Sequence, residues 1–364
     1  MKRIVALILG LAIIIGVILL IRQTIDPSGL TRLEQVTVRG YYGSEKADFL
    51  ADPDVQAHLK KTYRITLDLK KMGSMEMASL NPEEPIDILW PSSEIPVTAI
   101  ENRFGTKVKK NATIAYSPMI IGTWKSLVPI LKANDLVQSS PQDQMDVLRL
   151  EKLLMLTVDG RTWSDLAAND AYAVRKTIVV KTTDPKRSNS GLLFLAMSAN
   201  ILSGKSVVTS MDAPALAEKL KLLFQAQGFQ SKTSSLPWED YLNKGRGDTP
   251  LVWAYEAQMV ETLSRYGSRR GGDELYLLYP SPTIWSNHVL ISLSDGGNRL
   301  LTALLEDAFL QKKLNEYGFR NQYQNGDYFL TYYRNKGLEL PATFDDVATL
   351  PTYETMEKLL KFLP

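Results

Sequence analysis

The uncharged apolar run at the N-terminus, from Ile4 to Ile21, constrains this chain more than any other feature. A helix of this length spans about 27 Å, enough to cross the hydrocarbon core of a bilayer. The run leads into Arg22-Gln23-Thr24-Ile25-Asp26-Pro27 without the small-residue site at which signal peptides are cleaved. A buried helix of a soluble domain is the alternative, but such helices usually carry a polar stripe. We therefore predict that residues 1–22 remain as a transmembrane signal anchor, followed by a linker at 23–33.

The charges that flank this run favour one orientation in the membrane. Lys2, Arg3 and the amino terminus outnumber Arg22 on the other side, and the more positive flank stays in the cytoplasm. We expect a single-pass protein of the inner or cytoplasmic membrane, held there through residues 4–21. Its C-terminal domain is then extracytoplasmic.

The near-neutral charge and the scarcity of Cys and His exclude several classes of function. The chain has 42 Lys and Arg against 40 Asp and Glu, so no basic excess points to nucleic acid as a partner. It has no Cys, and its two histidines, His58 and His288, are far apart in the sequence. This leaves no disulfide, no thiol nucleophile and no local metal-binding motif. We therefore expect neither a cofactor nor a metal.

Beyond the linker, short strand patterns alternate with helix patterns, which is typical of an α/β fold with parallel sheets. Strands are predicted at 36–42, 64–69, 86–90, 113–116, 178–183, 251–255, 275–279 and 288–293. Helices are predicted at 192–202, 212–228, 298 to about 317, and near 353–362. Another helix is predicted from 140 to 154, because Ser140-Pro141 has the form of an N-cap followed by proline.

Small polar residues follow several of the predicted strands. They are Ser44, Ser93, Ser117 and the run Ser188-Asn189-Ser190. In open α/β sheets, ligands bind beyond the carboxyl ends of strands, where helix N-termini offer free N–H groups. Each serine could equally be a helix cap or a turn residue. The sequence alone does not say whether these loops converge.

Motifs of catalytic centres are absent from the sequence. It contains no phosphate-binding P-loop, no Gly-x-Gly-x-x-Gly and no Gly-x-Ser-x-Gly elbow. A Ser-His-Asp centre would have to recruit His58 or His288, and His288 has the setting of a hydrogen-bonded structural residue at the start of a strand. An enzyme that acts on cell-envelope polymers therefore has no motif in its favour.

Seven segments, in order over about 280 residues, carry a resemblance to one family. They lie at 40–46, 85–93, 115–122, 162–166, 183–191, 278–293 and 304–319. They resemble the ligand loops, hinge strands and terminal helix of the bacterial extracytoplasmic solute-binding proteins with the type II periplasmic binding fold. The resemblance implies a two-lobed α/β fold of this type, preceded here by the transmembrane helix. It also implies a discontinuous division, with 34–119 plus 285–364 in lobe 1 and 120–284 in lobe 2.

The resemblance further implies a ligand site between the lobes. The residues that it places there are Ser44, Glu45, Ser93, Ser117, Ser188, Asn189, Ser190, Tyr255 and Glu256. A carboxylate at position 256 disfavours a strongly anionic ligand unless it is paired, with Lys46 or Lys125 as candidate partners. The identity of the ligand therefore stays open.

Together these observations predict a membrane-anchored, non-catalytic solute-binding protein whose lobes close on a small polar ligand. Its further partner would be a membrane permease. The alternative is a scaffolding or sensing component of a cell-envelope complex, which uses the same fold with a degenerate cleft. Most members of the family are free or lipid-anchored, so the transmembrane helix is a departure that slightly favours the alternative.

Overall fold

The computed structural model describes residues 34–140 and 145–364. The predicted anchor at 1–22 and the predicted linker at 23–33 lie outside the described residues. Within 34–140 and 145–364, no helix is both long enough and apolar enough to cross a membrane.

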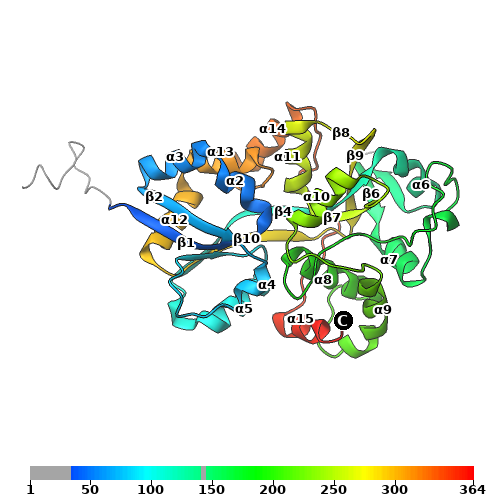
Figure 1. Ribbon diagram of the computed structural model, residues 1–364, viewed down its shortest axis with the longest axis horizontal. Helices are drawn as coiled ribbons and strands as arrows, with labels where there is room; N and C mark the ends of the chain where they lie inside the picture. Colours follow the sequence, from blue (N-terminus) through cyan, green and yellow to red (C-terminus); the bar gives the residue numbers. More distant parts are fainter. Residues whose placement is uncertain (1–33, 141–144) are drawn as a thin grey trace, which may run out of the picture.

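Ten strands of the described chain belong to one sheet system (Figure 1). They are β1 (Val36–Tyr42), β2 (Ile65–Lys71), β3 (Ile88–Trp90), β4 (Lys110–Trp124), β5 (Val137–Ser140), β6 (Met145–Arg149), β7 (Val252–Tyr255), β8 (Arg269–Arg270), β9 (Asp273–Ser281) and β10 (Trp285–Ser292).

The α-helices lie on both sides of these strands. They are α2 (Ala47–Ala51), α3 (Pro53–Thr62), α4 (Ser74–Met77), α5 (Glu94–Phe104), α6 (Val128–Ala133), α7 (Leu150–Val158), α8 (Asn189–Ser203), α9 (Ala213–Gln225), α10 (Ser235–Lys244), α11 (Glu256–Tyr266), α12 (Asp295–Glu306), α13 (Ala308–Glu316), α14 (Asp327–Arg334) and α15 (Tyr353–Leu360). Short 3-10 helices are η1 (Ser44–Lys46), η2 (Gly105–Lys107), η3 (Lys125–Leu127), η4 (Trp163–Asp165) and η5 (Tyr323–Gly326).

The sheet is mixed, whereas the sequence pattern predicts parallel sheets. The strand order is β2-β1-β3-β10-β4-β9-β6-β5, and β7 also pairs with β4. β1 is parallel to β2 and β3, but β4 and β10 run antiparallel to their neighbours. The reason is that β4 carries the chain out of the first lobe and β10 brings it back in the opposite direction.

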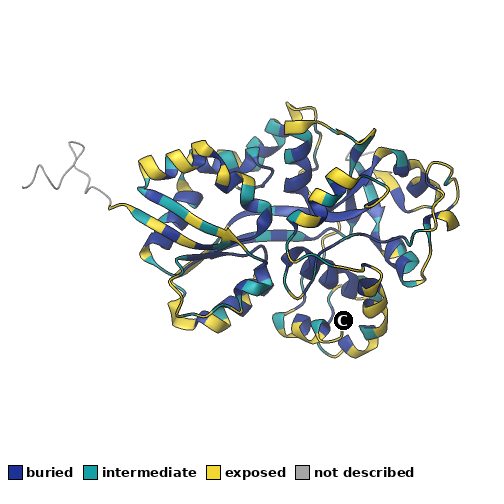
Figure 2. Ribbon diagram, in the orientation of Figure 1, coloured by how far each residue is buried: buried dark blue, intermediate teal, exposed yellow. Residues whose placement is uncertain are grey.

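β4 is the strand that joins the two lobes. Its first part, up to Pro118, pairs with β10, and its second part, from Met119, pairs with β7 and β9. The chain returns from β9 to β10 beside this point, and Met119 N–H donates to the Ile284 carbonyl at 2.9 Å. β4 and β10 are largely buried where they cross the middle of the molecule (Figure 2). Two crossing segments side by side are suited to act as a hinge.

Local capping signals fix several helices in the first lobe. Pro53 opens α3, and the Asp52 carboxylate accepts hydrogen bonds from the N–H groups of Asp54 and Val55 at 2.7 and 3.2 Å. The helix predicted from 298 to about 317 is two helices, because Asp307 is extended between α12 and α13. Its carboxylate accepts a hydrogen bond from Leu310 N–H at 3.0 Å and so starts α13.

Two further sequence expectations are wrong. Residues 145–149, predicted to be helical, form β6, and α7 begins only at Leu150. Burial alternates along β6, which is the period of a strand and is satisfied by pairing with β5 and β9. The strand predicted at 178–183 is reduced to isolated bridges, from Lys181 to Val252 and from Thr183 to Ser231.

The C-terminal part of the chain makes a third crossing. We name residues 341–352 the C-terminal strap; it starts beside Arg320 and then runs along Thr283, which exchanges backbone hydrogen bonds with Asp346 and Ala348 at 2.8 Å. The strap leads to α15, which contacts α9 of the second lobe and α5 of the first (Figure 1). The terminal helix therefore touches both lobes, and the division at 34–119 plus 285–364 and 120–284 stays a prediction.

Candidate functional site

Loops of both lobes meet in one place where the lobes face each other. From the first lobe come the loop after β1, which includes η1, and the residues Ser92 and Ser93 after β3. From the second lobe come the loop 183–191 before α8 and the residues before α10. Hydrogen bonds join the two groups directly: Ser235 N–H donates to Ser44 Oγ at 3.1 Å, and Ser93 Oγ donates to Asn189 Oδ1. The loops after β1 and β3 therefore converge with the loop before α8 and the residues before α10.

We name the group of buried polar side chains at this meeting point the interlobe polar cluster. Its members are Ser44, Glu45, Lys46, Ser92, Ser93, Asn189, Ser234, Tyr255, Ser286 and His288. The cluster lies beyond the carboxyl ends of β1, β3 and β7, which is where an open α/β sheet offers a ligand site.

An ion pair between Glu45 and Lys46 forms the centre of the cluster. Lys46 Nζ lies 2.5 Å from Glu45 Oε1, and the two side chains are only 1% and 2% exposed. Lys46 also donates to Ser92 Oγ at 2.8 Å, and Ser92 donates to Glu45 Oε1 at 2.5 Å. Burial tends to raise the pKa of the Glu45 carboxyl, but Lys46 and His288 outweigh it and hold that pKa below its ordinary value. Burial lowers the pKa of the Lys46 ammonium, and Glu45 opposes this shift.

His288 closes the inner side of the cluster. Its ring is fully buried, with Nδ1 3.4 Å from Glu45 Oε1 and Phe319 edge-on at 5.0 Å between ring centres. Burial lowers the pKa of His288 to about 4, and the Lys46 ammonium acts in the same direction. The imidazole is therefore neutral at pH 7. The sequence-based view of His288 as a structural residue is compatible with this position.

Asn189 is the main link from the second lobe into the cluster. It is the first residue of α8, and its Nδ2 donates to the Ser92 carbonyl at 3.0 Å and to Tyr255 Oη at 3.3 Å. Its Oδ1 accepts the hydrogen bond from Ser93. One side chain thus contacts both a first-lobe loop and the end of β7. Its hydrogen bonds to the first lobe would be lost if the lobes moved apart.

The structure brings some of the predicted site residues into the cluster and leaves others outside it. Ser44, Glu45, Ser93, Asn189 and Tyr255 are members. Ser188 lines the small cavity beside the cluster, and the buried Ser190 hydroxyl has no hydrogen-bond partner in the described structure. Ser117 lies at the hinge, where its Oγ accepts a hydrogen bond from Ala257 N–H at 3.2 Å.

Glu256 has a partner that the sequence did not suggest. Its carboxylate pairs with Arg320, at 2.7 Å from Nε and 2.8 Å from Nη2, and also accepts a hydrogen bond from Tyr279. The candidate partners were wrong: Lys46 pairs with Glu45, and Lys125 pairs with Glu274 at 2.8 Å. Arg320 lies close because the chain after α13 bridges back to Tyr116 of β4. Glu256 therefore belongs to the hinge rather than to the cluster.

The lobes are in backbone contact at the edge of the cluster. Met75 N–H donates to the Arg187 carbonyl at 3.0 Å, and the Arg187 guanidinium lies 3.4 Å from Glu76. A Cβ atom on Gly73 would lie 2.3 Å from the Arg187 carbonyl oxygen. Only glycine allows this close approach of the two backbone segments.

Little free space remains inside the closed lobes. The cavity between Gly43, Ser74, Asn189 and Thr233 has a volume of about 10 Å³, roughly the minimum for one water molecule. A groove of about 220 Å³ leads from the outside to Ser44 and Glu45, with Asp48 on the first lobe and Trp238 and Glu261 on the second. A solute larger than water therefore needs the lobes to open or Glu45 to move.

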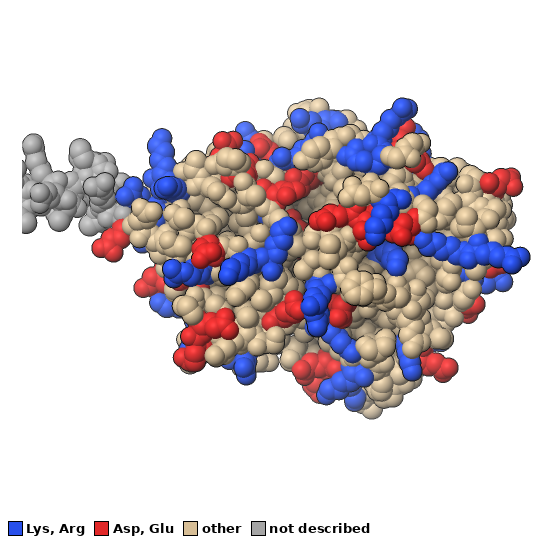
Figure 3. All heavy atoms as spheres, in the orientation of Figure 1, with Lys and Arg blue, Asp and Glu red and all other residues tan. Residues whose placement is uncertain are grey.

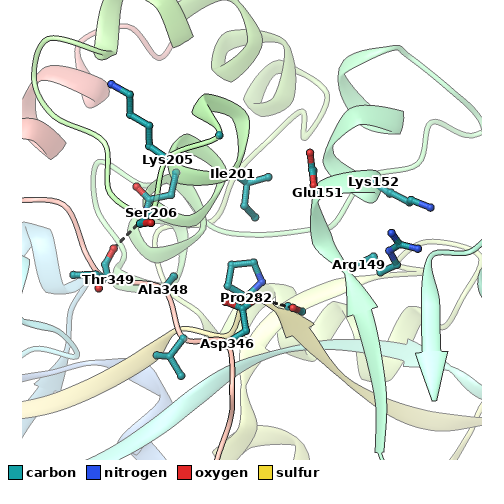
Figure 4. A pocket seen from close by; sticks show the side chains of 14 residues that line it. Arg149, Glu151, Lys152, Ile201, Lys205, Ser206, Pro282, Asp346, Ala348 and Thr349 are labelled. Atoms are coloured by element: carbon teal, nitrogen blue, oxygen red, sulfur yellow. Dashed lines mark hydrogen bonds between the residues drawn. The ribbon is translucent and has the colours of Figure 1, made fainter. Parts of the chain in front are cut away.

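A larger hollow of about 490 Å³ lies away from the cluster, between the end of α8, the start of α7 and the C-terminal strap (Figure 4). Its basic side chains already have acidic partners. Lys152 and Arg149 pair with Asp135, and Lys205 pairs with Asp212. In the close-up, Lys152 and Lys205 extend in opposite directions (Figure 4). No predicted site residue lines this hollow.

Acidic and basic side chains are interspersed on the face of the molecule shown in Figure 3.

Among the residues that the structure describes, no group of three or more His, Asp or Glu side chains is arranged to hold a metal ion. The chemistry available in the cluster is therefore that of one buried ion pair, neutral hydroxyls, an amide and a neutral imidazole.

Sequence reasoning missed several members of the cluster. Lys46 and Ser92 stand directly beside predicted residues, so widening each loop by one position would have included them. Ser286 and His288 lie inside β10, and the sequence of a strand that is buried along most of its length does not show which face its polar side chains point to. Ser234 follows a loop without a strand signal, and nothing in the sequence indicates that this loop reaches the first lobe.

Comparison with solved structures identifies the fold. The sulfate-binding protein SubI from Mycobacterium tuberculosis superposes with a TM-score of 0.51 and 14% sequence identity, over 90% of this chain and 96% of that one. The periplasmic binding protein P5PA superposes with a TM-score of 0.53 and 12% identity, over 90% of this chain and 98% of that one. No family model matches the sequence, and no curated protein matches it. The chain has the type II periplasmic binding fold, and the predicted two-lobed α/β architecture is confirmed.

Proposed function

We propose that this chain is an extracytoplasmic solute-binding protein that closes its two lobes on a small polar solute and catalyses no reaction. The observation that carries the proposal is the convergence of loops from both lobes on the interlobe polar cluster. Hydrogen bonds such as those from Asn189 to the Ser92 carbonyl and from Ser235 to Ser44 exist only when the lobes are closed. A solute held by the same groups would bias the hinge toward closure.

The proposal includes a membrane anchor formed by residues 1–22, with the linker at 23–33. It rests on the uncharged run Ile4–Ile21 and on the positive charges before it. The domain from residue 34 onward then lies outside the inner or cytoplasmic membrane, tethered close to its surface. A receptor with such a tether delivers its solute to a permease in the same membrane.

A scaffolding or sensing component of a cell-envelope complex is the second candidate. The observation in its favour is the Glu45–Lys46 pair, which fills the place of a solute and leaves a cavity of only about 10 Å³. In this alternative, the lobes stay closed permanently and the surface, rather than the cleft, carries the function.

Native mass spectrometry of the full-length chain, released from detergent micelles, separates the two candidates. The solute-binding proposal predicts a co-purified adduct of one small mass, which is lost on denaturation and is weaker in the Asn189→Ala variant. Protein without an adduct, whose melting temperature does not respond to a small-molecule extract of the cell envelope, would favour the scaffold.

A further inference from the structure

The Glu45 carboxylate behaves like a bound group rather than like an ordinary surface side chain. Its Oε1 accepts hydrogen bonds from Lys46 and from Ser92, at 2.5 Å each, within the first lobe. Its Oε2 accepts a hydrogen bond from Ser234 of the second lobe at 3.3 Å. A group that donors of both lobes hold stabilises the closed arrangement, which is what a solute does in a two-lobed binding protein.

The atoms that surround this carboxylate form a set of donors. The Lys46 ammonium carries three N–H donors and no acceptor, and the hydroxyls of Ser92 and Ser234 both donate to Glu45. Glu45 and Lys46 are the charged members of the interlobe polar cluster, since His288 is neutral. If Glu45 left, the cluster would hold Lys46 beside hydroxyl donors, and such a site favours an anion that keeps the buried amine protonated and pairs with it.

The Glu45 side chain also has room to leave. It lines the groove of about 220 Å³, whose walls also include Asp48 of the first lobe and Trp238 of the second. The residue belongs to η1, a single 3-10 turn directly after β1, so rotation of its side chain needs no change in the sheet. A solute that enters along the groove therefore meets Glu45 first and Lys46 behind it.

Resting on the proposed function, we infer that the Glu45 carboxylate occupies the position that an oxyanion group of the solute takes. The ligand class is then a small solute with a carboxylate or another oxyanion, which displaces Glu45 and pairs with Lys46. In this role Glu45 is an internal competitor of the solute and not one of its contacts. The pairing of Glu256 with Arg320 removes the charge that would have opposed such a ligand at the hinge.

The test compares melting temperatures of the full-length chain in detergent, with formate, sulfate, phosphate or succinate as probes and chloride at equal ionic strength as the reference. Glu45→Ala frees the donors and the space, so about 50 mM of an oxyanion should raise its melting temperature by roughly 4 °C or more over chloride. Glu45→Gln removes the charge but keeps the bulk of the side chain, so it should respond less than Glu45→Ala because its amide still has to move aside. The double variant Glu45→Ala with Lys46→Met is the matched control, since it has the space but not the cation, and it should not respond.

The size of the responding anions separates a solute site from a merely structural ion pair. A solute site between movable lobes accepts sulfate, phosphate or succinate at least as well as formate. Stabilisation by formate alone, or an equal response in the double variant, would overturn the inference. Glu45→Ala that does not fold even in the presence of these anions would contradict it as well, since an anion at Lys46 should replace the lost carboxylate.

Native mass spectrometry of the wild-type chain keeps this inference distinct from the proposed function. An adduct with an oxyanion group supports both. An adduct without one leaves the solute-binding proposal standing and overturns the role of Glu45. If Glu45→Ala binds oxyanions but the wild-type chain binds no solute, Glu45 does occupy an oxyanion position, and the solute-binding proposal is overturned.

Discussion

Arg320 and Glu256 form a buried two-point ion pair at the hinge, with Nε to Oε2 at 2.7 Å and Nη2 to Oε1 at 2.8 Å. The two side chains are 6% and 0% exposed. Arg320 also donates to the Pro341 carbonyl at 2.8 Å, where the C-terminal strap begins. The pair therefore ties α11, the segment after α13 and the strap together at the point where the chain crosses between the lobes.

Removing one partner of this pair should destabilise the protein strongly. Arg320→Ala leaves the Glu256 carboxylate buried without its cation, and losses of this kind cost about 3–5 kcal/mol. Denaturant unfolding followed by tryptophan fluorescence measures the change. Arg334→Ala is the matched control, because the exposed Arg334–Glu339 pair should contribute about 0–1 kcal/mol. Equal losses in the two variants would contradict the account of the hinge.

A methyl group at position 73 should keep the lobes apart. Gly73 has φ −64°, which alanine adopts freely, but its Cβ would lie 2.3 Å from the Arg187 carbonyl oxygen of the facing lobe. Gly73→Ala should therefore raise the radius of gyration in small-angle scattering and weaken solute binding at least about tenfold, or about 1.4 kcal/mol. Gly247→Ala is the control, since a Cβ there meets nothing within 4 Å. A Gly73→Ala chain as compact as the wild type would show that the lobes tolerate the insertion.

Asn189 should matter more for solute binding than the serines on either side of it. Asn189→Ala removes the interlobe contacts to Ser92 and Ser93, which are neutral hydrogen bonds of about 0.5–1.5 kcal/mol each. The solute affinity should fall between about fivefold and a hundredfold by calorimetric titration. Ser190→Ala is the control, because the Ser190 hydroxyl has no hydrogen-bond partner in the described structure. A larger loss of affinity in Ser190→Ala than in Asn189→Ala would reverse this assignment.

Glu261 should make the stability of the protein depend on pH. Burial, together with the Asp48 carboxylate, raises the pKa of Glu261 to about 8 from 4.5, and outweighs the Arg265 guanidinium 3.3 Å away, which acts in the opposite direction. The folded state thus keeps a proton that the unfolded chain releases. The stabilisation is fully present below pH 4.5 and is lost as the pH rises through 8, at up to about 1.4 kcal/mol per pH unit.

Glu261→Gln should remove this loss. The variant should match the wild type near pH 4.5 and exceed it by roughly 2–4 kcal/mol at pH 8, as measured by denaturant unfolding at both pH values. Glu218→Gln, at an exposed position on α9, should follow the wild type throughout. A Glu261→Gln chain with the same pH profile as the wild type would show that Glu261 is ionised in the folded state.

The sequence predicts the fold well, because its signals are local and ordered. The loops around Ser44 and Ser93 follow the parallel strands β1 and β3, and parallel strands bring such loops to one edge. The failure to find the partner of Glu256 comes from long-range pairing. The partner of Glu256 is 64 residues away and reaches it only through the bridge between Tyr116 and Arg320. No spacing rule links those positions.

Competing local signals explain the other errors. Ser140-Pro141 predicts a helix start, but the alternating burial of residues 145–149 and the free edge of β9 favour a strand there. Capping by Asp307 divides one predicted helix into α12 and α13. At the site, the sequence predicts solute contacts from Ser188, Asn189 and Ser190 alike, whereas the contacts to the first lobe come from Asn189 and the Arg187 carbonyl. The rotation of α8 about its axis decides which side chain of this polar run faces the first lobe. The composition of the run does not determine that rotation.

The proposed function requires that the lobes open and close in response to a solute at the interlobe polar cluster. Because the chain has no Cys, two introduced cysteines can be labelled selectively, at Lys60 on α3 and Lys221 on α9, both of which are exposed. Single-molecule energy transfer between the labels then reports on the lobe separation of the full-length chain. We predict two populations, with the closed one growing as an envelope small-molecule extract is added, and a much weaker response in Asn189→Ala. A single closed population in the wild type, unchanged by the extract, would contradict it.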